Sequence, residues 1–214
     1  MGAMENVGCV IYRDDYVQRD ELISDTKKES VFNVFLHEIS HMWFGNLVTM
    51  KWWDDLWLNE SFANYVSYIC LDEAPGLEQY KLAWTLFLDE SFWGLEEDQR
   101  NTTHSISVDV IHTEAAQDIF DGISYGKGAA WLNQTFHFFG REVFSVGIAS
   151  YFKEYSFKNT QLPDFIRHLD QAAKQLKIET DLARWTDTWL KKAGCNILWH
   201  DIVEEDGKIK KFTV

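Results

Sequence analysis

The hydrophobic pattern is clearest in residues 26–73, where it predicts two long helices. The first starts at Thr26-Lys27-Lys28-Glu29, which reads as a capping box, and Gly45 is a natural stop for it. A short segment, Leu47–Met50, leads to a second helix from about Asp54 to Glu73, which ends before Pro75-Gly76. We expect the two helices to face each other. The apolar face of the first comprises Val31, Val34, Phe35, Leu36, Ile39, Met42 and Trp43.

Most of the remaining chain also shows helical periodicity. Cys9–Tyr12 is β-branched and aromatic and predicts a short strand, and residues 105–112 alternate well enough to be extended. The pattern as a whole predicts an α+β chain that is mainly helical, with a small sheet on its N-terminal side. The further helices are predicted near residues 77–93, 115–121, 125–139, 141–155, 162–176 and 181–193, with Gly94, Gly140, Pro163 and Gly194 near their boundaries.

The pattern changes after residue 196. Residues 197–203 and 209–214 form two alternating runs, and Asp206-Gly207 between them is a hairpin signal. We therefore predict one domain over residues 1–196 and a β-hairpin over residues 197–214.

Composition and charge fit a well-packed globular protein. The 214 residues are 46% hydrophobic and 15% aromatic, which is enough for one domain with a substantial core. Most of the ten tryptophans are expected to lie in that core. The formal net charge of −14 argues against nucleic acid and anionic membranes as partners, and it suits a cationic peptide amino terminus.

Cysteine usage bears on the compartment. Cys9, Cys70 and Cys195 are odd in number, widely spaced and without a C-x-x-C pair, which predicts reduced thiols and a cytoplasmic or organelle-matrix location. No apolar run approaches the length that spans a bilayer, and no signal-peptide pattern leads the chain. We therefore expect no transmembrane segment in this sequence.

A metal-binding pattern lies in the first helix. In His37-Glu38-Ile39-Ser40-His41 the histidines are four residues apart, so both imidazoles can reach one ion. Glu60 is placed to complete a set of three ligands, which suits Zn²⁺ and leaves a fourth position open, as in catalytic sites. Glu38 is too close to His37 to bind the same ion from a helix, but it can accept a proton from water at the open position. The sequence therefore predicts one Zn²⁺ per chain, held by His37, His41 and Glu60.

Three separated motifs resemble, in order and spacing, those of the zinc aminopeptidases that include aminopeptidase N. Gly2–Asn6 reads GAMEN, residues 37–60 read H-E-x-x-H-x18-E, and Asp121–Gly128 contains an S-Y-x-K-G-like segment. The resemblance covers residues 2 to about 199 and implies a thermolysin-like gluzincin catalytic domain. Family members are normally several times longer. The resemblance therefore implies that residues 1–196 lack the start of the sheet lobe and that the hairpin begins a following β-domain.

The resemblance also implies roles for individual residues. Glu5 would hold the free α-amino group of the substrate, while the backbone of Gly2 and Ala3 would pair with its main chain. Tyr125 would donate to the oxyanion of the tetrahedral intermediate. Asn59 could orient a zinc-bound histidine, because ligating imidazoles usually have such partners. The other histidines lack ligand spacing and are interpreted as structural or surface residues: His104, His112, His137, His168 and His200.

The resulting hypothesis is a zinc aminopeptidase that hydrolyses the N-terminal peptide bond with a metal-activated water. Its substrate would be a peptide with a free N-terminus, and flanking domains or partner subunits would cover the cleft. Two alternatives stay open. One is a catalytically silent scaffold or assembly subunit, against which the intact set of ligands and Glu38 argues. The other is a bifunctional epoxide hydrolase and aminopeptidase, because the H-E-I-S-H sequence resembles that branch of the family equally well.

Overall fold

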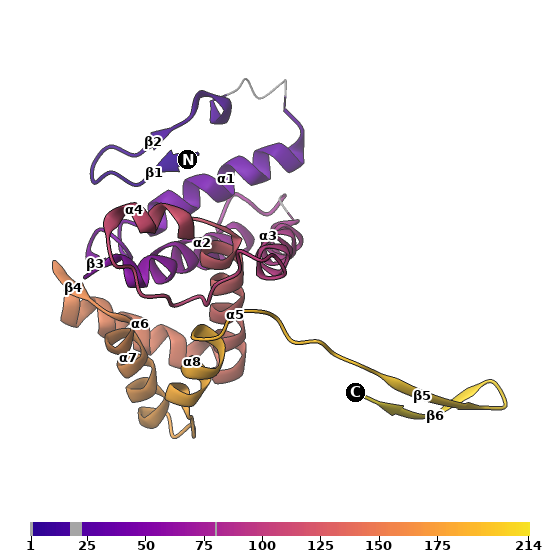
Figure 1. The fold of residues 1–214 in the computed structure, drawn as a ribbon. Coiled ribbons are helices and arrows are strands. Elements are labelled where there is room, and N and C mark those ends of the chain that lie inside the picture. Colours follow the sequence, from indigo (N-terminus) through magenta and orange to yellow (C-terminus); the bar gives the residue numbers. More distant parts are fainter. Residues whose placement is uncertain (1, 18–22, 80) are drawn as a thin grey trace.

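The computed structural model describes residues 2–17, 23–79 and 81–214, which form a mainly helical α+β structure (Figure 1). This fold class agrees with the prediction. The α-helices are α1 (Asp25–Ser40), α2 (Leu56–Glu73), α3 (Ala83–Asp98), α4 (Thr113–Ala116), α5 (Gly128–Phe139), α6 (Arg141–Tyr155), α7 (Leu162–Gln175) and α8 (Leu182–Leu190). The strands are β1 (Ala3–Met4), β2 (Ile11–Tyr12), β3 (Val48–Met50), β4 (Lys158–Thr160), β5 (Asp201–Glu205) and β6 (Lys208–Thr213). Short 3₁₀-helices cover Asp14–Tyr16, Trp53–Asp55 and Gln117–Ile119, and a π-helical segment, η5, covers Ile123–Lys127.

Helix α1 begins earlier than the predicted capping box. Ser24 is its N-cap, and the Ser24 hydroxyl accepts a hydrogen bond from the Lys27 backbone N–H (3.2 Å). The capping box at Thr26 is therefore wrong, because Ser24 offers the same oxygen two residues earlier. The α-helix also ends at Ser40, before Gly45, whose φ of 128° lies in the region that glycine tolerates.

Helix α2 forms the centre of the main hydrophobic core and packs closely against α1 and α5. The helix is buried on more than one side, since Trp57 and Phe62 point in different directions from its axis and both lie in the core. Figure 1 shows α2 and α5 between the N-terminal elements and the α6–α8 helices. The tryptophans are less buried than predicted: Trp57 and Trp131 lie in the core, whereas Trp52, Trp84, Trp93 and Trp199 are exposed.

Helix α3 starts later and ends later than predicted. Residues 77–82 precede the helix, residue 80 lies outside the described part, and the helix continues past Gly94 to Asp98. Gly94 is buried inside α3 because the helix crosses η5 there: a Cβ at this position would lie 2.5 Å from Lys127 N and 2.8 Å from Gly122 O. The glycine marks a close crossing rather than a helix boundary.

The other predicted helices correspond to α4 with its 3₁₀ continuation, η5 with α5, and then α6, α7 and α8. Residues 105–112, by contrast, form no strand. The segment Leu47–Met50, predicted as a connection, contains β3, which pairs in parallel with β4. The sequence pattern did not reveal this pair because each strand has only three residues.

Two aspartates at the start of α2 bridge to distant segments. The Asp54 carboxylate accepts a hydrogen bond from Val110 N (2.6 Å), and the Asp55 carboxylate accepts one from Leu162 N (3.0 Å). Asp55 makes no side-chain hydrogen bond to its own helix. These residues therefore tie the start of α2 to two other parts of the chain.

Strands β5 and β6 form the predicted hairpin, with Asp206 and Gly207 at its turn. The β5–β6 hairpin is exposed and extends away from the helices in Figure 1. The division into domains at residue 196 stays a prediction. Among the described residues, no helix combines the length and the apolar character needed to cross a membrane.

Candidate active site

Helices α1 and α2 bring His37, His41 and Glu60 together. The two histidine Nε2 atoms lie 3.0 Å apart, and Glu60 Oε2 lies 3.4 Å from His37 Nε2 and 3.5 Å from His41 Nε2. Ligands about 2.1 Å from a tetrahedral zinc are separated by about 3.4 Å, so these donor atoms fit such an ion. The chemistry of the donors, two imidazoles and one carboxylate, fits it as well.

Neighbouring groups orient the ligands. His41 Nδ1 lies 3.0 Å from the Phe44 carbonyl oxygen, in the turn that follows α1, which directs Nε2 toward the other two donors. The hydrogen bond of Asn59 goes to Glu60 Oε1 (3.3 Å). Asn59 was the predicted partner of a ligating histidine, but it contacts Glu60 instead. The group that orients His41 is the Phe44 carbonyl.

The charges around these atoms favour a bound cation. Burial lowers the pKa of His41, but the hydrogen bond to Glu60 and the charges of Glu60 and Glu5 outweigh it and hold the pKa at about 9. Burial raises the pKa of Glu60, yet hydrogen bonds to His37 and His41 outweigh this effect and lower it overall. The electrostatic environment at this point is therefore negative and favours the binding of a proton or a metal ion.

Glu38, on α1, lies beside the three candidate ligands. Its side chain is buried, and its Oε2 atom has no hydrogen-bond partner among the described residues. Burial raises the pKa of Glu38, while the neighbouring His37 and His41 oppose the rise. A buried carboxylate with one unsatisfied oxygen and a raised pKa has the properties of a general base.

Tyr125 reaches the site from η5. Its ring stacks near that of His37, with 6.1 Å between centroids, and Ser61 fixes the segment by donating to the Ser124 carbonyl oxygen (2.5 Å). Burial and the charge of Glu60 raise the pKa of Tyr125 far above its usual value. The phenol therefore keeps its proton and can act as a hydrogen-bond donor.

The N-terminal segment around β1 approaches the candidate ligands with Gly2, Ala3 and Glu5. Glu5 Oε1 lies 3.9 Å from His41 Nδ1, and its backbone oxygen accepts a hydrogen bond from Asn46 Nδ2 (2.8 Å). The opposite edge of β1 is paired with β2, since Ala3 lies opposite Tyr12. Together these contacts hold the Glu5 carboxylate beside the candidate metal ligands.

These residues line a cleft of about 720 Å³. Sequence reasoning placed Gly2, Ala3, Glu5, His37, Glu38, Glu60 and Tyr125 in one site, and all seven line this cleft, while His41 is buried behind it. The cleft also contains residues that the motifs did not indicate, among them Asn33, Asn64, Glu90, Trp93 and Phe120. Asn33 and Asn64 could have been found, because each lies four residues from a ligand on the same helix. Glu90 and Trp93 come from α3, for which the sequence holds no comparable signal.

Comparison with known proteins gives consistent matches. The Peptidase family M1 domain matches residues 1–193. Aminopeptidase N of Streptomyces lividans is 41% identical over 100% of this chain, and Aminopeptidase M1 of Arabidopsis thaliana is 39% identical over 98% of it. Aminopeptidase N of Lactococcus lactis subsp. lactis is 35% identical over 95% of the chain. The chain spans only about a quarter of these relatives, at 24%, 23% and 23% of their lengths.

Proposed function

The chain belongs to peptidase family M1, and on that premise we propose that it is the catalytic part of a zinc aminopeptidase. The observation that carries the proposal is the position of Glu5. Ligating atoms of Glu5, Glu38 and His41 all lie within 4.8 Å of one another. In a peptide, the terminal nitrogen and the first carbonyl carbon are about 2.5 Å apart. A substrate ammonium paired with Glu5 would therefore present its first peptide bond, and no later one, to Glu38 and the metal ligands.

His37, His41 and Glu60 would hold the zinc ion. When bound, zinc would supply Lewis-acid polarisation of the carbonyl and make water more acidic. The names of the relatives support this activity, since the three cited above are all aminopeptidases.

The protein's own residues would divide the remaining chemistry. Glu38 accepts a proton from the attacking water and returns it to the departing amine. Tyr125 donates a hydrogen bond to the carbonyl oxygen as negative charge develops there, and burial of the phenol strengthens this interaction. Glu5 keeps the substrate ammonium in place throughout, while the backbone of Gly2 and Ala3 lies beside the substrate main chain.

The experiment that tests this proposal compares free and amino-acetylated peptides. Acetylation removes the charge that Glu5 binds, so the wild-type protein should cleave only the free peptide efficiently. Glu5→Ala should lower kcat/KM on free peptides by about ten- to hundredfold, the value of a charge-assisted hydrogen bond. Glu114→Ala, at an exposed position outside the cleft, is the matched control. Equal cleavage of the two peptides would indicate an endopeptidase and contradict the proposal.

The length of the relatives supports a further part of the proposal. Because the chain spans about a quarter of them, we expect flanking domains or partner subunits to cover the cleft in the native protein. Kinetic tests are therefore best made on the longest native form.

A further inference from the structure

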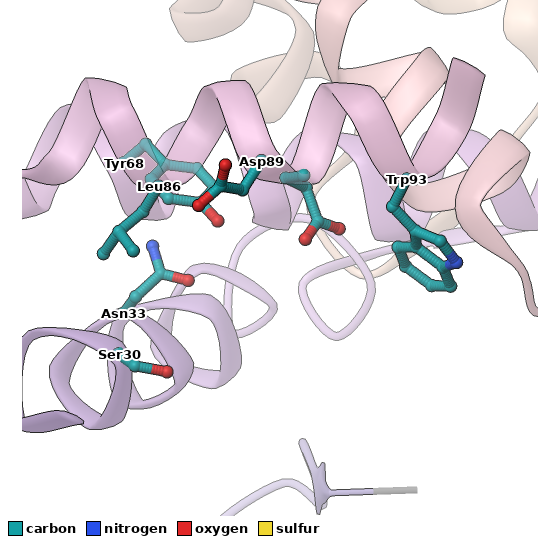
Figure 2. A pocket seen from close by; sticks show the side chains of 7 residues that line it. Ser30, Asn33, Tyr68, Leu86, Asp89 and Trp93 are labelled. Carbon is teal, nitrogen blue, oxygen red and sulfur yellow. The ribbon is translucent and has the colours of Figure 1, made fainter. Parts of the chain in front are cut away.

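A second cavity, of about 290 Å³, lies beside the main cleft. Figure 2 shows Ser30 and Asn33 of α1 on one side of it and Leu86, Asp89 and Trp93 of α3 on the other. The two spaces are continuous, because five residues line both. The residues that line this cavity, called the Glu90 pocket below, are Ser30, Asn33, Tyr68, Leu86, Asp89, Glu90 and Trp93.

The position of the Glu90 pocket along α1 defines its relation to a substrate. Glu5 lies beside His41, at the C-terminal end of the helix. Asn33 lies one turn before His37 and eight residues before His41, which is about 12 Å along the helix axis. The ligands therefore lie between Glu5 and the pocket. A peptide that places its ammonium at Glu5 and its first carbonyl at the ligands would continue toward the Glu90 pocket.

The pocket is lined with acceptors and negative charge. Glu90 Oε1 accepts a hydrogen bond from Asn64 Nδ2 (2.9 Å), whereas Glu90 Oε2 has no such partner among the described residues. The amide of Asn33 donates to Ser67 Oγ (3.0 Å), which leaves its oxygen as an acceptor. Asp89 adds a second carboxylate, and the residues found to line the pocket include no lysine, arginine or histidine.

The half-buried carboxylate of Glu90 thus forms no ion pair with a lysine or arginine within the described part of the chain. Burial raises the pKa of Glu90, against the opposing hydrogen bond from Asn64 and the charge of His37. A cation that entered the pocket would remove this cost by pairing with Glu90 in a partly desolvated space.

We propose that the Glu90 pocket binds the side chain of the second substrate residue, the one after the cleaved bond, and selects lysine or arginine there. The direction of the substrate in this inference rests on the proposed function, since Glu5 fixes the amino end. The pocket adds a preference that the motifs alone do not imply. Glu90 is the specificity-determining residue, and Asn64 positions its carboxylate.

The test uses zinc-loaded native protein and three peptides that share their first residue and carry lysine, leucine or glutamate second. We expect kcat/KM for the lysine peptide to exceed that for the leucine peptide by about tenfold or more, and the glutamate peptide to be poorest. Glu90→Gln keeps an acceptor for Asn64 and removes the charge, so it should reduce the lysine-to-leucine ratio to within about twofold of unity. Glu96→Gln, exposed on the same helix, should keep the wild-type ratio.

Equal wild-type rates for lysine and leucine, or an unchanged ratio in Glu90→Gln, would overturn the inference. A binding measurement separates this failure from that of the proposed function. In a Glu38→Gln background, the dissociation constants of the lysine and leucine peptides can be compared by calorimetry with and without Glu90→Gln. If no peptide is cleaved by the wild type, tighter binding of lysine that depends on Glu90 still supports the pocket, and equal binding refutes it.

Discussion

Carboxylates differ in role according to the groups that surround each one. Glu60 is paired with two imidazoles, whereas one oxygen of the neighbouring Glu38 is buried without a partner among the described residues. Asp55 accepts a backbone hydrogen bond from the start of α7, and Glu90 faces a cavity. These environments are the basis for the proposed roles of metal ligand, general base and specificity residue and for the structural link made by Asp55, and each carboxylate should respond differently to substitution or pH.

Asp55 gives a pH-dependent prediction for stability. Burial raises the pKa of its carboxyl to about 6, with the Leu162 N–H opposing the rise. The folded state then holds the proton more tightly than the unfolded chain does, so the carboxyl's contribution to stability falls as the pH rises through about 4 to 6. Asp55→Asn keeps an acceptor without the charge. The free energy of unfolding of Asp55→Asn, relative to that of the wild type, should therefore increase by about 1–3 kcal/mol as the pH rises from 4 to 7.

Chemical denaturation at several pH values measures this difference. Asp118→Asn, at an exposed position, is the control and should show a much smaller change with pH. A relative stability of Asp55→Asn that decreases as the pH rises would contradict the burial-based account of Asp55.

At the scale of elements, the crossing of α3 and η5 determines where Tyr125 lies. The two elements approach closely at Gly94 and at Gly126, whose added Cβ would contact the Glu90 carbonyl. Lys127 also pairs with the buried Asp98 at 2.6 Å, which ties η5 to the end of α3. The close contact of η5 with α3 at these glycines therefore helps to set the position of Tyr125.

Gly94→Ala tests this crossing. A Cβ would lie 2.5 Å from Lys127 N, so α3 and η5 must separate, at an expected cost of about 1–3 kcal/mol in stability. Movement of η5 should also displace Tyr125 and reduce kcat. Equilibrium unfolding and steady-state kinetics measure both effects, with Glu96→Ala on the exposed face of α3 as control. Wild-type stability and kcat in Gly94→Ala would show that the crossing tolerates the change.

Elements with a strong local pattern were predictable. The period of apolar residues indicated α1 and α2, and the spacing within H-E-x-x-H-x18-E indicated which side chains could meet. Boundaries failed where tertiary contacts decide them. Gly94 continues α3 because it is needed at a crossing, and β3 and β4 are too short for a pattern. Glu90 could not be placed in the site, because only the packing of α3 against the other helices brings it there.

At the scale of the whole molecule, the site connects segments from distant parts of the sequence. The candidate ligands come from α1 and α2, Tyr125 from η5 and Glu5 from the end of β1. A metal ion bound to both helices would therefore stabilise their packing as well as serve chemistry. The compartment in which the protein works stays a prediction.

Removal of zinc should accordingly lower the melting temperature. Saturation at a hundredfold excess over Kd stabilises the folded state by about 2.7 kcal/mol, which corresponds to several degrees for a domain of this size. A chelator should thus lower the Tm of the wild type and of His137→Ala, an exposed control. The chelator should leave the Tm of His41→Ala nearly unchanged. An equal chelator effect in His41→Ala would place the stabilising metal elsewhere.

The most direct test of the proposed mechanism is the turnover of Glu38→Gln with its zinc content measured on the same sample. The amide cannot accept the proton of water, while His37, His41 and Glu60 remain to bind the ion. The account predicts one zinc per chain, as in wild type, and a loss of kcat of about a hundredfold or more. Full zinc content with kcat within about tenfold of wild type, a barrier change of only ~1.4 kcal/mol, would contradict the role of Glu38 as general base.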